Sequence, residues 1–272
     1  MWYNNLYGVI PETLYNLDSM LALVLDANKL SGTISPSISK LRKLQTCSLM
    51  RNQLNGTIPP TIAQLTDLNG LALYSNQLTG TIPDIFSQNG VITMKRLSQI
   101  NIGNNQFNGT VPASIWNITT LTVLALNHND LSGDIPTTIG KLTRTRLLDL
   151  ASNRFNSSIP SEIQFLSNLE IVSFANNQLT GSIPSTMMHL SKLKFFSLGA
   201  NKLKGEIPPS LGNLTNLKTL ILFGNVLSGT VPVSFQQLKN LSKYHYCINY
   251  FLNVLHVMII ITIAVRYQNT HI

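Results

Sequence analysis

The amino-acid sequence predicts an α/β repeat protein, a right-handed solenoid of about ten 24-residue coils with a parallel β-sheet on its concave face. The first observation is a segment, L-x-x-N-x-L-x-G-x-I-P, that recurs along the chain. The second is the spacing of its asparagines, which is 24 residues throughout except for one interval of 29. Self-similarity at such a period is the signature of stacked repeats. The repeated asparagines are Asn4, Asn28, Asn52, Asn76, Asn105, Asn129, Asn153, Asn177, Asn201 and Asn225.

Each repeat is expected to contain one short strand directly before its asparagine. The residues five and three positions before the asparagine are apolar, as Leu71 and Leu73 are before Asn76. Alternation with a period of two predicts a strand with one buried face. The asparagine follows where the chain must bend, and its amide can bond to backbone groups that the bend leaves unpaired. Stacked repeats should therefore carry a ladder of asparagine amides.

The second half of the repeat contains a glycine four residues after the asparagine and then an Ile-Pro step. The glycine indicates a positive φ or a close approach, and the proline sets φ for the next turn. Ser157 replaces the glycine in one repeat and Ser35 replaces the proline in another, so we expect those two coils to be distorted. The long interval adds five residues around Ser87–Thr93, where Asn89-Gly90 is a turn signal. This insertion should bulge from the convex or lateral side, either as a binding loop or as a neutral insertion.

One repeat cannot bury its apolar edge alone, so the repeats must stack around a shared leucine core. We expect this solenoid over residues 1–249 and an apolar tail over 250–272. The tail contains an apolar run over 254–265, followed by Arg266. A membrane span needs ~20 apolar residues. The tail is therefore either a transmembrane segment that could anchor the chain or out-of-register sequence.

Composition and motifs argue against catalysis and nucleic-acid binding. The net charge is +8, but only 11% of the residues are charged and no basic run occurs. No kinase, phosphate-loop, hydrolase or zinc-protease motif is present, and the five histidines share no metal-ligand spacing. We therefore expect no catalytic residue, metal or cofactor. Cys47 occupies a core position, and Cys247 lies about eight coils further on, too far for a disulfide.

The pattern L-x-x-L-x-x-L-x-L-x-x-N-x-L-x-G-x-I-P resembles the plant-specific class of extracellular leucine-rich repeats, over about Trp2 to Leu241. The resemblance implies a ligand-recognition ectodomain of a receptor-like kinase or receptor-like protein. Such a protein acts in defence or development, binds a peptide or protein ligand and pairs with a co-receptor kinase. A full-length relative would carry a serine/threonine kinase domain that this sequence lacks. The implied location is the cell membrane or the apoplast.

Two alternatives stay open. The same coil builds secreted inhibitors of fungal polygalacturonases, and a gene fragment without activity would also preserve the repeats. Ectodomains of this class begin with a signal peptide and a cysteine-paired cap. Met1 to Asn5 match neither, and the sequence starts inside a repeat, so we expect a truncated product whose first coil exposes core leucines.

Residues two, four and six positions before each asparagine should point outward from the concave sheet. The sixth position is apolar in four successive coils, as Val123, Leu147, Ile171 and Phe195. This apolar column is either a partner site or a sheet edge covered by the preceding loop. The candidate ligand-binding residues are Met50, Tyr74, Val123, Asn127, Leu147, Asp149, Ile171, Phe195, Ile221 and Phe223.

Six N-x-[ST] sequons lie outside the buried strand positions. They would be surface glycosylation sites in a secreted protein, although an asparagine-rich sequence also creates sequons by chance. Their asparagines are Asn55, Asn108, Asn117, Asn156, Asn213 and Asn240.

Overall fold

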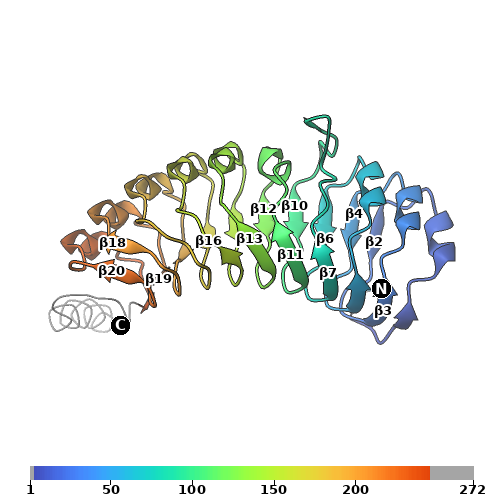
Figure 1. The fold of residues 1–272 in the computed structure, drawn as a ribbon, viewed down its shortest axis with the longest axis horizontal. Helices are drawn as coiled ribbons and strands as arrows, with labels where there is room; N and C mark the ends of the chain where they lie inside the picture. The colour runs from blue at the N-terminus through green and yellow to red at the C-terminus, as the bar shows by residue number, and fades with distance from the viewer. Residues whose placement is uncertain (1–2, 246–272) are drawn as a thin grey trace, which may run out of the picture.

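The computed structural model describes residues 3–245, and within them the chain forms a curved stack of coils (Figure 1). The predicted solenoid with a parallel sheet is confirmed. The predicted tail over 250–272 and Cys247 lie outside the described residues, so the proposed domain boundary stays a prediction. Among the described residues, no helix is long and apolar enough to cross a membrane.

The inner side of the arc is a sheet of ten parallel strands, one from each coil. Its strands pair in register, so that Val123, Leu147, Ile171 and Phe195 lie side by side. The 29-residue interval does not disturb the register, because Gly70 still pairs with Gln99. The strands are β2 (Ala22–Val24), β4 (Thr46–Ser48), β6 (Gly70–Ala72), β10 (Gln99–Asn101), β12 (Val123–Ala125), β14 (Leu147–Asp149), β16 (Ile171–Ser173), β17 (Phe195–Ser197), β19 (Thr219–Ile221) and β21 (Lys243–His245).

A second parallel sheet, which the sequence analysis did not predict, forms from the residues after each asparagine. Its seven strands are β1 (Tyr7–Val9), β3 (Lys29–Thr33), β5 (Gln53–Gly56), β7 (Gln77–Thr81), β11 (Gln106–Thr110), β13 (Asp130–Gly133) and β15 (Arg154–Phe155). Further along, β18 (Lys204–Glu206) pairs with β20 (Val226–Ser228).

The repeated glycine meets both conditions that the sequence suggested. At Gly56, φ is +72°, and a Cβ there would lie 2.8 Å from Cγ2 of Thr33 in the preceding coil. Where Ser157 replaces the glycine, the second sheet ends at β15, and an isolated bridge from Ser158 to Thr180 takes its place before the pair of β18 and β20. The expectation for Ser35 was wrong: β3 stays intact, and the Ser35 hydroxyl accepts a hydrogen bond from the backbone N–H of Ser37 at 3.1 Å. It thereby caps the following helix, so no distortion is needed.

The outer side of the arc carries a row of 3₁₀-helices (Figure 1). Three to five residues per helix are too few for two α-helical turns, and prolines precede or begin most of them. The helices are η1 (Glu12–Asn16), η2 (Pro36–Lys40), η3 (Pro60–Gln64), η4 (Ile115–Asn117), η5 (Thr137–Lys141), η6 (Ser161–Phe165), η7 (Ser185–His189), η8 (Pro209–Asn213) and η9 (Val233–Gln237).

One continuous apolar core runs between the two sheets and the helices. The middle residue of each strand from β2 to β19 enters it, and Leu124, Leu148 and Phe196 are fully buried. Cys47 fills the same position, and burial raises the pKa of its thiol to about 12, so it is an inert core residue. In the first described coil, by contrast, Leu17 is exposed to solvent, as the sequence analysis expected.

The asparagine ladder is present and links adjacent coils. In the coil of Asn201, the side-chain N–H donates to the carbonyl of Phe174 at 2.9 Å, and its oxygen accepts from the N–H of Leu179 at 2.9 Å. Both partners belong to the preceding coil. The residue directly before each ladder asparagine turns the chain with a positive φ, as Ala200 does at 54°. The ladder thus satisfies backbone groups that the turn and the stacking leave inside the protein.

The insertion forms a small antiparallel hairpin of β8 (Ser87–Gln88) and β9 (Val91–Ile92). Asn89 and Gly90 both have positive φ, which is the backbone of a two-residue hairpin turn. The hairpin projects beyond the row of 3₁₀-helices (Figure 1), so the predicted bulge on the convex side is confirmed.

Candidate ligand-binding surface

The inner sheet determines which side chains reach the concave surface. In the nine strands from β2 to β19, each of three residues, the middle residue enters the core while the first and third point outward. Two positions further on, a third outward position precedes the turn. None of the ten candidate ligand-binding residues belongs to the buried core. Their outward placement therefore follows the predicted alternation.

The apolar column of Val123, Leu147, Ile171 and Phe195 is continuous across β12, β14, β16 and β17. Ile171 is 37% exposed, and the other three are partly exposed. Neighbouring parallel strands lie ~4.8 Å apart, so the column is about 14 Å long. An approaching chain can reach these side chains, although they also pack against one another.

The concave surface beside this column is made mostly of small residues. The second outward position holds Ala125 and Ser197, and the third holds Ala151, Gly103 and Gly199. The two glycines make room for larger neighbours from the next coil. A Cβ on Gly103 would lie 2.5 Å from the side-chain oxygen of Asn127, and one on Gly199 would lie 3.1 Å from the ring of Phe223. Asn127 and Phe223 therefore lie close over the two glycines, a contact that sequence reasoning missed because a glycine has no side chain of its own.

Two carboxylates lie on the concave surface, and their surroundings differ. Asp26 accepts from the hydroxyl of Ser48 at 2.7 Å and from the N–H of Met50 at 2.8 Å. Asp149 accepts from the N–H of Ala151 at 3.0 Å. Burial raises the pKa of Asp149, partly offset by that backbone bond, by His128 and by a hydrogen bond from Ser173.

An ion-pair cluster at the start of the strands was also missed. Glu170 accepts from Arg146 Nε at 2.8 Å and from Lys194 Nζ at 2.6 Å. The hydrogen bond from Lys194, and to a smaller extent the one from Arg146, lowers the pKa of Glu170 to about 2. The three residues follow one another at 24-residue intervals, so the period already placed them side by side.

The structure does not gather all ten candidates at one place. Eight of them belong to the coils from β12 to β19. Tyr74 and Met50 belong to the coils of β6 and β4, three and four strands before β14 in the sheet order. The eight that share one region form the candidate ligand surface, hereafter the ligand surface: Val123, Asn127, Leu147, Asp149, Ile171, Phe195, Ile221 and Phe223.

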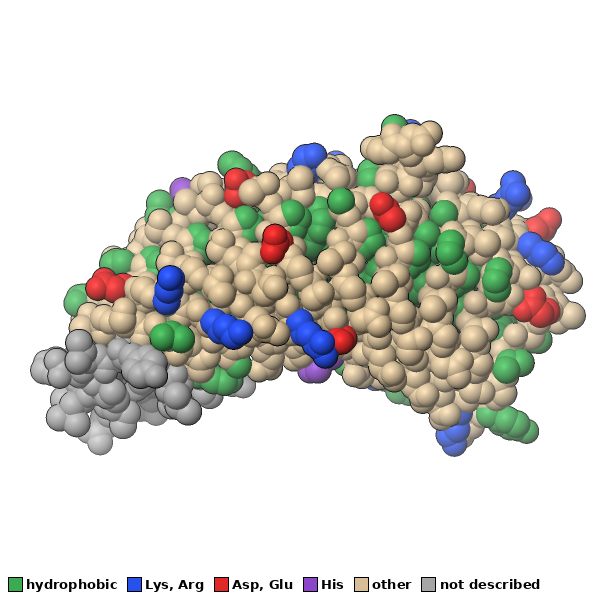
Figure 2. All heavy atoms as spheres, in the orientation of Figure 1, with side chains coloured by type: hydrophobic (Ala, Val, Ile, Leu, Met, Phe, Trp, Pro, Cys, Tyr) green, Lys and Arg blue, Asp and Glu red, His purple; other side chains and the backbone are tan. Residues whose placement is uncertain are grey.

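The sequon asparagines lie away from the ligand surface. Asn55 and Asn108 are exposed on strands β5 and β11 of the second sheet, and in Figure 2 the surface over β7 is mainly neither hydrophobic nor charged. Asn117 differs, because its amide donates to the carbonyl of Ala113 at 3.0 Å and accepts from Lys141 at 2.7 Å. The other three, Asn156, Asn213 and Asn240, are exposed.

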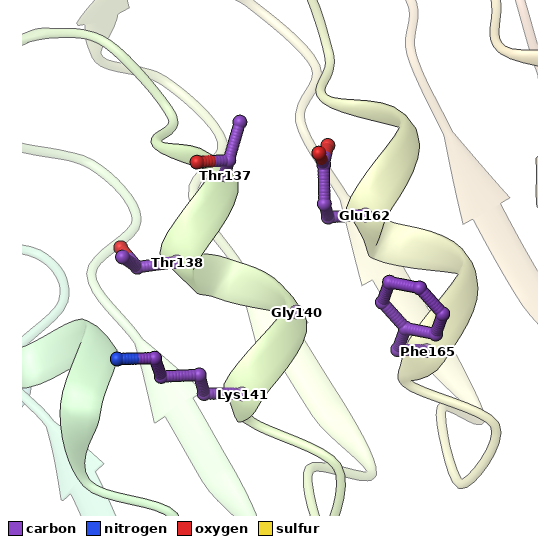
Figure 3. A pocket seen from close by; sticks show the side chains of 6 residues that line it. All are labelled: Thr137, Thr138, Gly140, Lys141, Glu162 and Phe165. Atoms are coloured by element: carbon purple, nitrogen blue, oxygen red, sulfur yellow. The ribbon is translucent and has the colours of Figure 1, made fainter.

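Pockets also occur on the described part of the outer face, and those at η5 and at the hairpin bring together no set of catalytic or metal-binding side chains. One lies between η5 and η6, where Glu162 and Phe165 face Gly140 and Lys141 points away (Figure 3). The other lies between η3 and the hairpin and includes Asp84 and Gln88. Within residues 3–245, no group of three or more histidines, cysteines and acids could hold a metal ion.

Comparison with known proteins identifies the class. A family model described as a leucine-rich repeat region matches residues 100–251, more than half of the sequence. The chain belongs to the leucine-rich repeat family. No protein matched among the curated sequences.

Similar solved structures come from plant receptors. A plant peptide hormone receptor, RGFR1 in complex with RGF2, is 32% identical with a TM-score of 0.80, over 91% of this chain and 43% of that one. A TDR receptor is 31% identical with a TM-score of 0.85, over 91% and 42%. The Arabidopsis receptor kinase HAESA, in complex with the peptide hormone IDA and the co-receptor SERK1, is 31% identical with a TM-score of 0.85, over 92% and 41%. This chain therefore spans less than half the length of these three.

Proposed function

We propose that this chain is the ligand-recognition part of a plant leucine-rich-repeat receptor-like kinase or receptor-like protein, and that it binds a peptide on the ligand surface. The observation that carries the proposal is the partly exposed apolar column, continuous over four coils, with small residues beside it. Support comes from two similar structures, since RGFR1 is a peptide hormone receptor and HAESA was solved with the peptide hormone IDA. The proposed role is signalling without catalysis by these repeats, in defence or development.

The size of the column suits a short extended segment. Four strands span ~14 Å, which is the reach of four or five extended residues at ~3.4 Å each. Burying about 200 Å² of apolar surface contributes on the order of 5 kcal/mol at ~25 cal/mol per Å². Ordering a flexible peptide offsets much of that gain. Polar contacts from Asn127 and Asp149 would supply the remainder.

The accompanying proposals follow from the same class. A co-receptor kinase would join the peptide-bound protein, in the way that the HAESA complex contains the co-receptor SERK1. The six sequon asparagines would carry glycans on an extracellular or membrane-attached protein. Asn117 would be the poorest acceptor once folded, because its amide is already hydrogen-bonded on both sides.

The test selects binders from a phage-displayed library of random dodecapeptides and compares three proteins. The column variant carries Ile171→Asp and Phe195→Asp. The matched control carries Gln77→Asp and Gln106→Asp, which also place two acids on neighbouring coils, but on the exposed second sheet. We expect selected peptides to bind the wild type and the control alike and to bind the column variant at least tenfold more weakly. Equal binding to all three proteins, or no selected peptide, would refute the proposal.

A further inference from the structure

Asp149 is the one charged side chain among the outward positions of the coils from β10 to β19. On the sheet, its neighbours in the adjacent strands are Ala125 and Ser173. Along its own chain, Leu147 and Ala151 share its face. These four side chains are apolar or small and none is positive. The middle of the ligand surface therefore contains one carboxylate, and none of these four neighbours can form an ion pair with it.

Within the described part of the protein no ion pair includes Asp149, and its charge is favoured only in part by His128 and by hydrogen bonds from Ala151 and Ser173. The bases nearest along the strands, Arg146 and Lys194, are engaged by Glu170 at the sheet edge. His128, on the turn after β12, is exposed and lies against Asn127 at 3.1 Å. A half-buried carboxylate without an ion-pair partner attracts a cation more strongly than an exposed carboxylate does, because solvent screens it less.

We propose that the peptide on the ligand surface places a lysine or arginine side chain on Asp149, with apolar side chains of the same peptide on the column beside it. This inference rests on the proposed function and specifies its ligand. Asp149 and Leu147 are two residues apart on one strand, which separates them by ~6.7 Å on the same face. One extended peptide can therefore meet both with alternate side chains. The small side chains of Ala151 and Ala175 leave space for the stem of the cation.

Asp26 shows why position alone does not make such a site. It also faces the concave surface, but Ser48 and Met50 already satisfy its oxygens. A ligand cation would have to compete with those bonds. Asp149 accepts from the N–H of Ala151 and from Ser173, whereas Asp26 accepts three bonds spread over both of its oxygens. The remaining acceptor sites of Asp149 are those that charge-assisted hydrogen bonds from a guanidinium or ammonium group would use.

The experiment sequences the dodecapeptides selected on the wild type and measures the affinity of the strongest five. Each is tested against the wild type, Asp149→Asn and Asp134→Asn, the last removing an exposed carboxylate just past β13. Each peptide is also remade with its basic residue replaced by glutamine. We expect a basic residue in the selected sequences. We also expect a loss of about tenfold with Asp149→Asn, no loss with Asp134→Asn, and no further loss when both partners are changed.

Selected peptides without a basic residue, or equal affinity for the wild type and Asp149→Asn, would overturn this inference. If those peptides still failed on the column variant, the proposed function would stand while the cation at Asp149 would not. Selected peptides that depend on neither Asp149 nor the column would overturn both. If the losses of affinity from Asp149→Asn and from the glutamine replacement in the peptide added up, the basic residue would bind elsewhere than at Asp149.

Discussion

Replacing Asn201 by alanine should destabilise the protein by about 3 kcal/mol, although the side chain is small and polar. Asn201 is 7% exposed, and its oxygen is the acceptor for the buried N–H of Leu179 at 2.9 Å. Its amide also donates to the carbonyls of Phe174 and Leu198 at 2.9 and 3.0 Å. The orphaned N–H alone costs ~1–3 kcal/mol, and each lost bond adds ~0.5–1.5 kcal/mol.

The loss of stability is limited because both carbonyls also accept hydrogen bonds from neighbouring asparagines of the ladder. Phe174 still accepts from Asn177 at 3.1 Å, and Leu198 still accepts from Asn225 at 3.0 Å. The N–H of Leu179, in contrast, has Asn201 as its one acceptor among the ladder asparagines of the described residues. We therefore expect its amide hydrogen to exchange much faster in the variant, while amides several coils away keep their protection.

Urea unfolding followed by circular dichroism measures the loss, and hydrogen exchange locates it. Asn156→Ala is the control, since Asn156 is exposed and lies outside the ladder; its stability should stay within ~0.5 kcal/mol of the wild type. Similar stabilities for Asn201→Ala and Asn156→Ala would refute the view that the ladder stabilises the stack. A large loss without faster exchange at Leu179 would place the cause elsewhere.

Three further predictions concern the second sheet and the ligand surface. Gly56→Ala should cost about 1–2 kcal/mol in urea unfolding, because φ is +72° and the new Cβ would lie 2.8 Å from Thr33; normal stability would contradict this. The double variant Ile171→Asp with Phe195→Asp should unfold within a few degrees of the wild type, since both side chains are partly exposed; a steep fall in Tm would favour the packing interpretation of the column. Asp149→Asn should be more stable than the wild type at neutral pH. The raised pKa of Asp149 means that folding favours its protonated form, so the gap should close as the pH falls through that pKa; a gap that is constant with pH would contradict this.

The period of the sequence predicted most of the architecture, and the reason is physical. Leu124 and Leu148 are buried in the same way because each coil repeats the environment of the one before it. A correct assignment at one asparagine therefore held at the others. The second sheet was not predicted because the segment around Gln53–Gly56 contains glycine and polar residues, which are poor strand formers in isolation. Its pairing comes from stacking, which no single repeat displays.

The ligand surface was predictable in outline only. Alternation along the strand identified the outward positions, and the period identified the apolar column. Neither tells whether an outward carboxylate has a partner: Asp26 and Asp149 are the same residue type on the same surface, and their hydrogen bonds differ. Nor does a glycine such as Gly199 indicate that the ring of Phe223 will fold over it. These features depend on side-chain contacts between coils, which the repeat pattern does not specify.

The division between constant and variable positions also explains where specificity can lie. The asparagine, the core leucines and the glycine are each required by a hydrogen bond, a buried volume or a backbone angle, so they cannot differ without cost to the stack. The outward positions meet no such demand, and in this chain they range from Gly103 to Phe195 and Asp149. Their pattern is therefore free to match a ligand. Asp149 tests this argument most directly, because burial of its charge costs stability in the free protein, and the charge contributes to binding when a cation of the ligand pairs with it.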